Sequence, residues 1–124
     1  MAIAVVIRQG HVLLVQRRDG ALLNWQFPAG VVKPEKSAER VAIQETKIET
    51  AIDAGISREI GARVHPITGV YCRYFLCDYL AGDAANQDIL ENVSVAWAPI
   101  NALARFIPTA NIYPPVLHAL GVSR

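Results

Sequence analysis

Apolar and polar positions follow a strand-like pattern over the first quarter of the chain. Residues 1–7 and 11–15 are apolar runs rich in β-branched side chains, and a polar turn ending in Gly10 separates them. This arrangement predicts a β-hairpin. A further turn is expected at residues 17–20, followed by a short strand at residues 24–27 that a Pro-Ala-Gly step ends.

The pattern changes to helical spacing over residues 37–53, after a loop at residues 31–36. We expect one long helix there, ending before Gly55. The remaining expected elements are strands at 59–65 and 70–80, a polar loop at 81–92, a strand at 93–98, and short helices at 101–106 and 114–120. Strands and helices do not alternate strictly, so the pattern favours a mixed α+β arrangement over a Rossmann fold.

The predicted helix carries acids on the side that faces the core. At 100° per residue, one stripe contains Ala38, Val41, Ala42, Glu45, Ile48, Glu49 and Ile52. The opposite side contains Glu39, Arg40, Thr46, Lys47 and Thr50. Carboxylates on a buried stripe must be paired, protonated or bound to a cation. The alternative is that both reach past the apolar edge, or pair with an arginine from elsewhere in the fold.

Composition and charge narrow the class of protein. The chain has 124 residues, 52% of them hydrophobic and 19% charged, which fits one globular domain over residues 1–124 and excludes disorder. The net charge of +1 provides no overall field to attract a nucleic acid polymer or an anionic membrane. A phosphate ligand would therefore need a local site.

The two cysteines and the shortness of the apolar runs bear on the cellular compartment of the protein. Cys72 and Cys77 lie five residues apart in an expected strand, so they point to opposite faces and should not form a disulfide. Free thiols suit a reducing compartment. The longest apolar run has seven residues, which is too short for a signal peptide or a membrane span, so a cytoplasmic location is expected.

The segment from Gly30 to Ile52, with residues 13–18 and 25–30 before it, resembles the Nudix hydrolase family of MutT-like proteins. That family's signature is G-x5-E-x7-R-E-U-x-E-E-x-G-U, where U is a bulky aliphatic residue. Four positions agree with it at the right spacing: Gly30, Glu45, Glu49 and Ile52. The resemblance extends over nearly the whole chain and implies an α/β fold, a Nudix α/β/α sandwich around a mixed β-sheet.

Several positions depart from the signature. Lys36 stands where the family has Glu, and Gln44 stands where it has Arg. Those family residues are thought to pair, so losing both leaves no single unpaired charge. Ala51 in place of Gly and Thr46 in place of an aliphatic residue are mild changes. Ile48 replaces an acid that helps bind Mg2+ in the family, and its side chain offers no oxygen to a hard cation.

The resemblance implies hydrolysis of a nucleoside diphosphate linked to another group, with Mg2+ or Mn2+ as the cofactor. Glu45 and Glu49 are then the expected catalytic residues. The expected metal ligands are Glu45, Glu49, the carbonyl of Gly30, and Glu91 from the loop before the late strand. For Glu91, an ordinary solvated acid is the alternative.

Four further residues are candidates for substrate binding: Arg17, Trp25, Phe27 and Asn111. Trp25 and Phe27 could stack on a base, although aromatic residues beside a turn are more often part of the core. Asn111 lies in a segment similar to one whose Asn reads a purine edge in MutT-type enzymes, and an amide can both donate and accept there. Its alternative role is the N-cap of the last helix.

The expected function is therefore a metal-dependent nucleotide pyrophosphohydrolase, weakened or altered by the losses at Lys36, Gln44 and Ile48. A catalytically inactive Nudix-fold module that binds a nucleotide or a protein is the alternative. The expected partner is a small-molecule nucleotide, with no nucleic acid polymer and no membrane. The resemblance also leaves a homodimer open.

Overall fold

The computed structural model describes residues 1–19 and 22–122, which form a seven-stranded mixed sheet between helices. Its strands are β1 (Ala2–Arg8), β2 (His11–Asp19), β3 (Leu22–Gln26), β4 (Ala29–Gly30), β5 (Asp53–Val64), β6 (Tyr71–Ala81) and β7 (Asn92–Pro99). The main order is β3-β2-β1-β6-β5, with β4 paired to β1 and β7 paired to β2. Only the pairing of β1 with β6 is parallel among these described strands.

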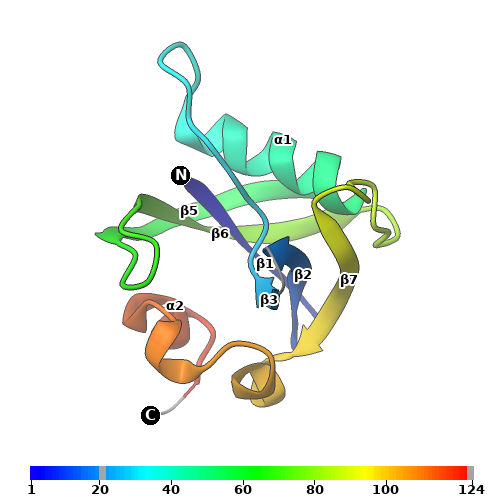
Figure 1. Ribbon diagram of the computed structural model, residues 1–124, viewed down its shortest axis with the longest axis vertical. Coiled ribbons are helices and arrows are strands. Elements are labelled where there is room, and N and C mark those ends of the chain that lie inside the picture. The colour runs from blue at the N-terminus through cyan, green and yellow to red at the C-terminus, as the bar shows by residue number, and fades with distance from the viewer. Residues whose placement is uncertain (20–21, 123–124) are drawn as a thin grey trace.

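Helices lie on both sides of this sheet (Figure 1). Helix α1 (Ala38–Thr50) covers one face. The other face carries two 3-10 turns, η1 (Ile100–Arg105) and η2 (Thr109–Asn111), and helix α2 (Pro114–Ala119). Each face has its own apolar core, so the predicted α/β/α sandwich is confirmed.

Most of the predicted strands and turns are present. Residues 1–7 and 11–15 form the expected hairpin, in which Ile7 pairs with Val12. The turn predicted at residues 17–20 is wrong for its first part, because β2 continues to Asp19 and pairs there with β3; Gly20 lies outside the described residues. The polar residues 17–19 resemble a turn in sequence, although the pairing of β2 with β3 continues through them.

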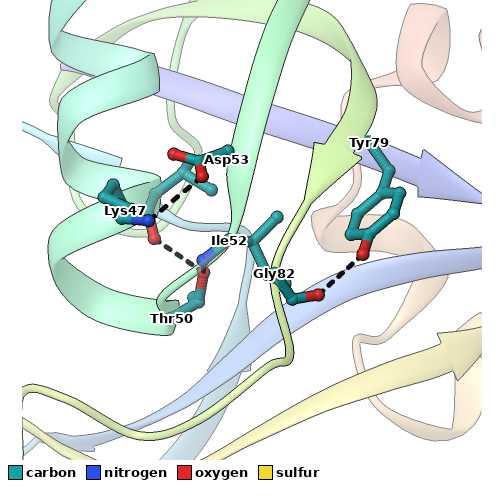
Figure 2. Close-up of polar contacts among 7 residues, drawn as sticks. Lys47, Thr50, Ile52, Asp53, Tyr79 and Gly82 are labelled. Atoms are coloured by element: carbon teal, nitrogen blue, oxygen red, sulfur yellow. Dashed lines mark hydrogen bonds and ion pairs between the residues drawn. The ribbon is translucent and has the colours of Figure 1, made fainter.

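The predicted end of the helix is also wrong. Helix α1 ends at Thr50, and Ala51 takes a left-handed conformation with φ 67°. Ile52 follows it, and β5 begins at Asp53, well before Gly55. Figure 2 shows the polar contacts at this junction: Lys47 pairs with Asp53 at 3.1 Å, and the Ile52 backbone N–H donates to the Thr50 hydroxyl. Apolar spacing alone does not mark this break.

The buried stripe of α1 differs from the predicted one. Thr46 and Thr50 are fully buried, whereas Ile48 is 56% exposed. The hydroxyl of Thr46 donates to the Ala42 carbonyl at 2.8 Å, and that of Thr50 donates to the Thr46 carbonyl at 2.6 Å. A threonine that bonds its own helix needs no other partner, so it can be buried where polarity predicts exposure.

Both cysteines are buried and free, as predicted. Cys72 belongs to the core under α2 and Cys77 to the core under α1, so they lie on opposite faces of the sheet. Burial raises the pKa of Cys77 to about 12, which keeps its thiol protonated at neutral pH. No helix within residues 1–19 and 22–122 is long and apolar enough to cross a membrane.

Candidate functional site

The acids of α1 are the centre of the candidate site. Glu49 is 4% exposed and Glu45, one turn before it, is half-buried. Burial, together with the negative charges of Glu45 and Asp88, raises the pKa of Glu49 to about 8. The positive charge of Arg17 and the polar backbone of Ala29 act in the opposite direction and lower this pKa. Without a cation, Glu49 is therefore mostly protonated at neutral pH, because burial disfavours its charged form.

Strand β4 shapes the space that Glu45 occupies. A Cβ atom at Gly30 would overlap the Glu45 side chain and would lie 2.8 Å from its Cδ atom and 2.9 Å from Oε1. A real Cβ contact is never that short, so only glycine lets the Glu45 carboxylate lie against β4. Gly30 and the Glu45 side chain thus lie side by side, as the signature spacing predicts.

One carboxylate oxygen at this site has no protein partner. Oε1 of Glu49 is buried and makes no hydrogen bond with any described residue. The loop between β6 and β7 runs past the C-terminal end of α1 (Figure 1), and Gln87 N donates to the Glu49 carbonyl at 3.3 Å. The Ala85 N–H donates in the same way to the Thr50 carbonyl at 2.9 Å. The loop therefore covers the end of the helix but leaves the Glu49 carboxylate oxygen unpaired.

Glu91 and Arg17, predicted for metal and substrate binding, pair with each other. Arg17 Nη2 lies 3.4 Å from Glu91 Oε2, and the Glu91 side chain is 59% exposed. Glu91 therefore lies at the surface, as in its alternative interpretation, while the charge of its partner Arg17 also lowers the pKa of Glu49. Among the described residues, no group of three or more His, Cys, Asp or Glu side chains is arranged to hold a metal ion.

The aromatic candidates divide between the core and the surface. Phe27 is 9% exposed and belongs to the core under α2, which matches the alternative weighed for it. Trp25 is half-buried and stacks edge-on against Phe106, with ring centroids 5.4 Å apart. Of the two aromatic residues, Trp25 is the more accessible to a ligand.

Asn111 is half-buried in η2, on the α2 face. Its carbonyl accepts a hydrogen bond from Arg63 Nη2 at 2.7 Å. Its alternative role as N-cap of the last helix is wrong, because α2 begins after Tyr113 and has no side-chain cap. Pro114 starts this helix and needs no cap for its own nitrogen.

Three of the residues that depart from the signature are exposed. Lys36 and Gln44 are both exposed, and Ile48 presents its side chain largely to solvent. These substitutions therefore leave the buried oxygen of Glu49 and the contact between Gly30 and Glu45 in place.

Sequence reasoning missed Asn92, the first residue of β7. Its side chain is 1% exposed, and neither its oxygen nor its nitrogen has a hydrogen-bond partner within the described part of the chain. The only signal in the sequence is an amide at a loop–strand boundary next to Glu91, and many solvated residues share that pattern.

Comparison with known proteins agrees with this architecture. The sequence model of the NUDIX domain family matches residues 1–120 of this chain. A Bacillus subtilis (strain 168) protein that carries the provisional name 8-oxo-dGTP diphosphatase is 31% identical over 107 residues, covering 86% of this chain and 70% of that protein.

Solved structures show the same fold. An ADP-ribose pyrophosphatase from Streptococcus suis has a TM-score of 0.73 at 22% identity, covering 98% of this chain and 91% of its own. A C. elegans Ap4A hydrolase has a TM-score of 0.78 at 19% identity, and the match covers 95% of this chain and 93% of that protein. Since the family model spans nearly the whole sequence, this chain belongs to the Nudix family, whose hydrolases act on phosphoanhydride bonds.

Proposed function

We propose that this protein hydrolyses a phosphoanhydride bond in a nucleoside diphosphate-linked small molecule and uses a divalent cation held by Glu45 and Glu49. The observation that carries the proposal is the buried Glu49 oxygen, which has no partner among the described residues and lies on a rigid helix beside a second acid. Such an arrangement is costly unless a positive ligand completes it.

The side chains present fit Mg2+ or Mn2+. Glu45 and Glu49 supply carboxylate oxygens, and the Gly30 carbonyl beside Glu45 is the expected third donor. Mg2+ commonly uses only one or two carboxylates, since substrate phosphates and water complete its shell. When bound, the cation neutralises negative charge on the diphosphate. Glu91 would join this set only by releasing Arg17.

The chain's own residues divide the remaining work. Glu45 is the more accessible acid, so its carboxylate is the one proposed to accept a proton from the attacking water. Glu49, with its buried and unpartnered Oε1, would hold the cation. Within the described residues, the Arg17 side chain is 30% exposed and makes one ion pair, a contact of 3.4 Å with Glu91, so we propose that it can turn toward a phosphate oxygen. Trp25 and Asn111 are the proposed contacts for the base.

The first substrate to test is oxidised deoxyguanosine triphosphate, because of the name of the 31% identical relative. ADP-ribose and Ap4A follow, since they appear in the names of proteins with the same fold. We propose a cytoplasmic location on the basis of the two free thiols. Size-exclusion chromatography with light scattering decides whether the protein is a homodimer.

The test is hydrolysis of a panel of 8-oxo-dGTP, normal dNTPs, ADP-ribose, Ap4A and nucleotide sugars with and without Mg2+ or Mn2+. Wild type is compared with Glu49→Gln and with Glu39→Gln. Glu39 is an exposed acid in the first turn of the same helix, so its variant controls for a general loss of charge. We expect metal-dependent product release by wild type and Glu39→Gln, and a large loss in Glu49→Gln.

Absence of metal-dependent release from every substrate contradicts the proposed activity. Tight nucleotide binding without hydrolysis would then favour the alternative of an inactive nucleotide-binding module. Equal activity of Glu49→Gln and wild type would instead exclude this helix as the metal site.

A further inference from the structure

Asn92 is an unpartnered polar side chain in the interior. It is 1% exposed, and neither Nδ2 nor Oδ1 meets a hydrogen-bonding group among residues 1–19 and 22–122. Burying an unsatisfied amide costs about 1–3 kcal/mol, so an apolar residue of the same size would give a more stable metal-free fold. The amide therefore calls for an explanation other than stability.

The register of the sheet shows which face Asn92 is on. It pairs with Arg17 of β2, and residues opposite one another in an antiparallel pair share a face. Further along the same two strands, Leu13 pairs with Trp97, and both belong to the core under α1. The pairing of β2 with β7 shifts by one residue between Gln16 and Arg17, and the extra residue lies in β7, since β2 pairs with β3 without a break. The count is therefore made along β2, where Arg17 lies an even number of positions from Leu13, so Arg17 and its partner Asn92 face α1. The influence of Arg17 on Glu49 is consistent with this placement.

The loop before β7 brings this position to the end of α1. Asn92 N donates to the Asp88 carbonyl at 2.8 Å, and Asn86 Nδ2 donates to the Asn92 carbonyl at 2.9 Å. The adjacent residue Gln87 bonds the carbonyl of Glu49. Loop residues 86–88 thus link Asn92 to the last turn of α1, where Glu49 Oε1 is also buried and unpartnered.

The described structure therefore contains a buried donor on the sheet face under α1, in Asn92, and a buried acceptor on α1, in Glu49. An amide N–H is a natural donor to a carboxylate, and such a charge-assisted bond is stronger than a neutral one. Carboxylates that ligate metals are themselves commonly oriented by hydrogen bonds from neighbouring residues.

We propose that Asn92 is a positioning residue for Glu49: its Nδ2 donates to Oε1 of the ionised carboxylate and aims the other oxygen at the bound cation. This rests on the proposed metal site and deepens it. In this arrangement β7 supplies a third element of the site, after α1 and β4. It also gives the amide a use that the metal-free fold lacks.

The experiment is titration of Mn2+ by calorimetry, with a melting curve without metal, for wild type, Asn92→Leu and Asn92→Asp. Each substitution is also made in the Glu49→Gln background, and Gln87→Leu, which removes an exposed side-chain amide and keeps the backbone N–H, serves as an amide control from the same loop. We expect Asn92→Leu to weaken Mn2+ binding about 10–100-fold, the usual effect of losing a group that orients a ligand. Its melting temperature without metal should be equal to or above that of wild type.

Asn92→Asp separates orientation from direct ligation. A second acid cannot donate to Glu49 and repels it, so we expect weaker Mn2+ binding. In the Glu49→Gln background, neither substitution at position 92 should change the remaining affinity by more than about twofold, since the residue acts through Glu49.

Tighter binding by Asn92→Asp would overturn the proposal, because it would make Asn92 a direct metal ligand. A lower melting temperature of Asn92→Leu with unchanged Mn2+ affinity would overturn it as well and would leave a structural role. If wild type binds Mn2+ and both variants bind equally well, this inference fails while the proposed function stands. If wild type itself binds no Mn2+, the proposed metal site fails and the inference fails with it.

Discussion

Two polar clusters lie on opposite faces of the same sheet, and they differ in how well they are satisfied. Under α2, Arg63 Nε donates to the Tyr74 hydroxyl at 3.1 Å and Nη2 donates to the Asn111 carbonyl at 2.7 Å. The Tyr113 hydroxyl donates to the Ala62 carbonyl at 3.1 Å. The Arg63 guanidinium also lies 5.6 Å and 5.3 Å from the centres of the two tyrosine rings. The polar groups named in this cluster therefore all have hydrogen-bond partners.

The cluster under α1 has the opposite character. Oε1 of Glu49 and both polar atoms of Asn92 are buried without partners in the described chain, and Glu45 adds a like charge. The first cluster ties η2 and the start of α2 to β5 and β6, so it stabilises the fold. The second is destabilising as it stands, and we attribute that cost to a ligand-binding role. The two clusters should therefore respond differently to substitution.

The largest effect is expected from Glu49→Gln. The amide keeps the shape of the carboxylate but loses the charge that a hard cation requires. We expect metal-dependent hydrolysis to fall at least about 10²-fold, as for the loss of a key electrostatic group. The metal-free variant should be at least as stable as wild type at pH 8, which a circular dichroism melt measures. Full activity in the folded variant would contradict the assignment.

Arg63→Met should break the satisfied cluster. It leaves the Tyr74 hydroxyl and the Asn111 carbonyl without their donor, so we expect a loss of about 2–3 kcal/mol in unfolding free energy. Mn2+ affinity should stay within about twofold of wild type. Urea denaturation and calorimetry measure the two quantities, and Arg105→Met provides the exposed control. A large loss of metal affinity would show that the clusters are not independent.

Gly30→Ala should disturb the unsatisfied cluster without removing an acid. The new Cβ atom displaces the flexible Glu45 side chain rather than the backbone. We expect Mn2+ binding to weaken about tenfold, because a ligand carboxylate is moved. Gly55→Ala is the matched control, since its nearest neighbour is a terminal Leu80 carbon at 3.3 Å. Equal Mn2+ affinities for the two variants would argue against Glu45 as a ligand.

Ile48→Glu should have the smallest effect. Ile48 is 56% exposed, so the substitution should change the unfolding free energy by no more than about 0.5 kcal/mol. An acid there restores the signature and can swing toward a cation, so we expect a gain of a few-fold in Mn2+ affinity. Unchanged affinity in the folded variant would mean that position 48 is not a vacated ligand position.

The sequence predicted the fold and the close approach of Gly30 to Glu45. Alternation and turn residues predicted most of the strands, and the spacing of Gly30, Glu45 and Glu49 anticipated the contact between β4 and α1. These features depend on local periodicity and on neighbours along one helix. The structure adds that Gly30 is required by the Glu45 side chain itself.

The sequence was not sufficient where polar side chains find partners that periodicity does not encode. The buried threonines of α1 donate hydrogen bonds to carbonyls of their own helix, which periodicity does not reveal. The apolar pattern therefore predicted a buried stripe through Ile48 instead of through Thr46 and Thr50. Asn92 escaped notice because its burial arises from the pairing of β7 with β2 and from the loop over α1. Contacts between distant segments decide both cases.

The most direct test of the account is the pH dependence of unfolding without metal. The pKa of Glu49 is about 8 in the folded protein, above its ordinary value of 4.5, so the folded state binds more protons between these values. Its unfolding free energy should therefore fall as pH rises from about 5 to about 8, by up to a few kcal/mol. Saturating Mn2+ should restore stability at pH 8.

Glu49→Gln is the comparison that isolates this carboxylate. We predict that the variant lacks most of the fall in stability between pH 5 and 8 and gains little from Mn2+. If wild type and Glu49→Gln show parallel curves, and Mn2+ stabilises both equally, then the buried carboxylate is not the unsatisfied group that the cation completes.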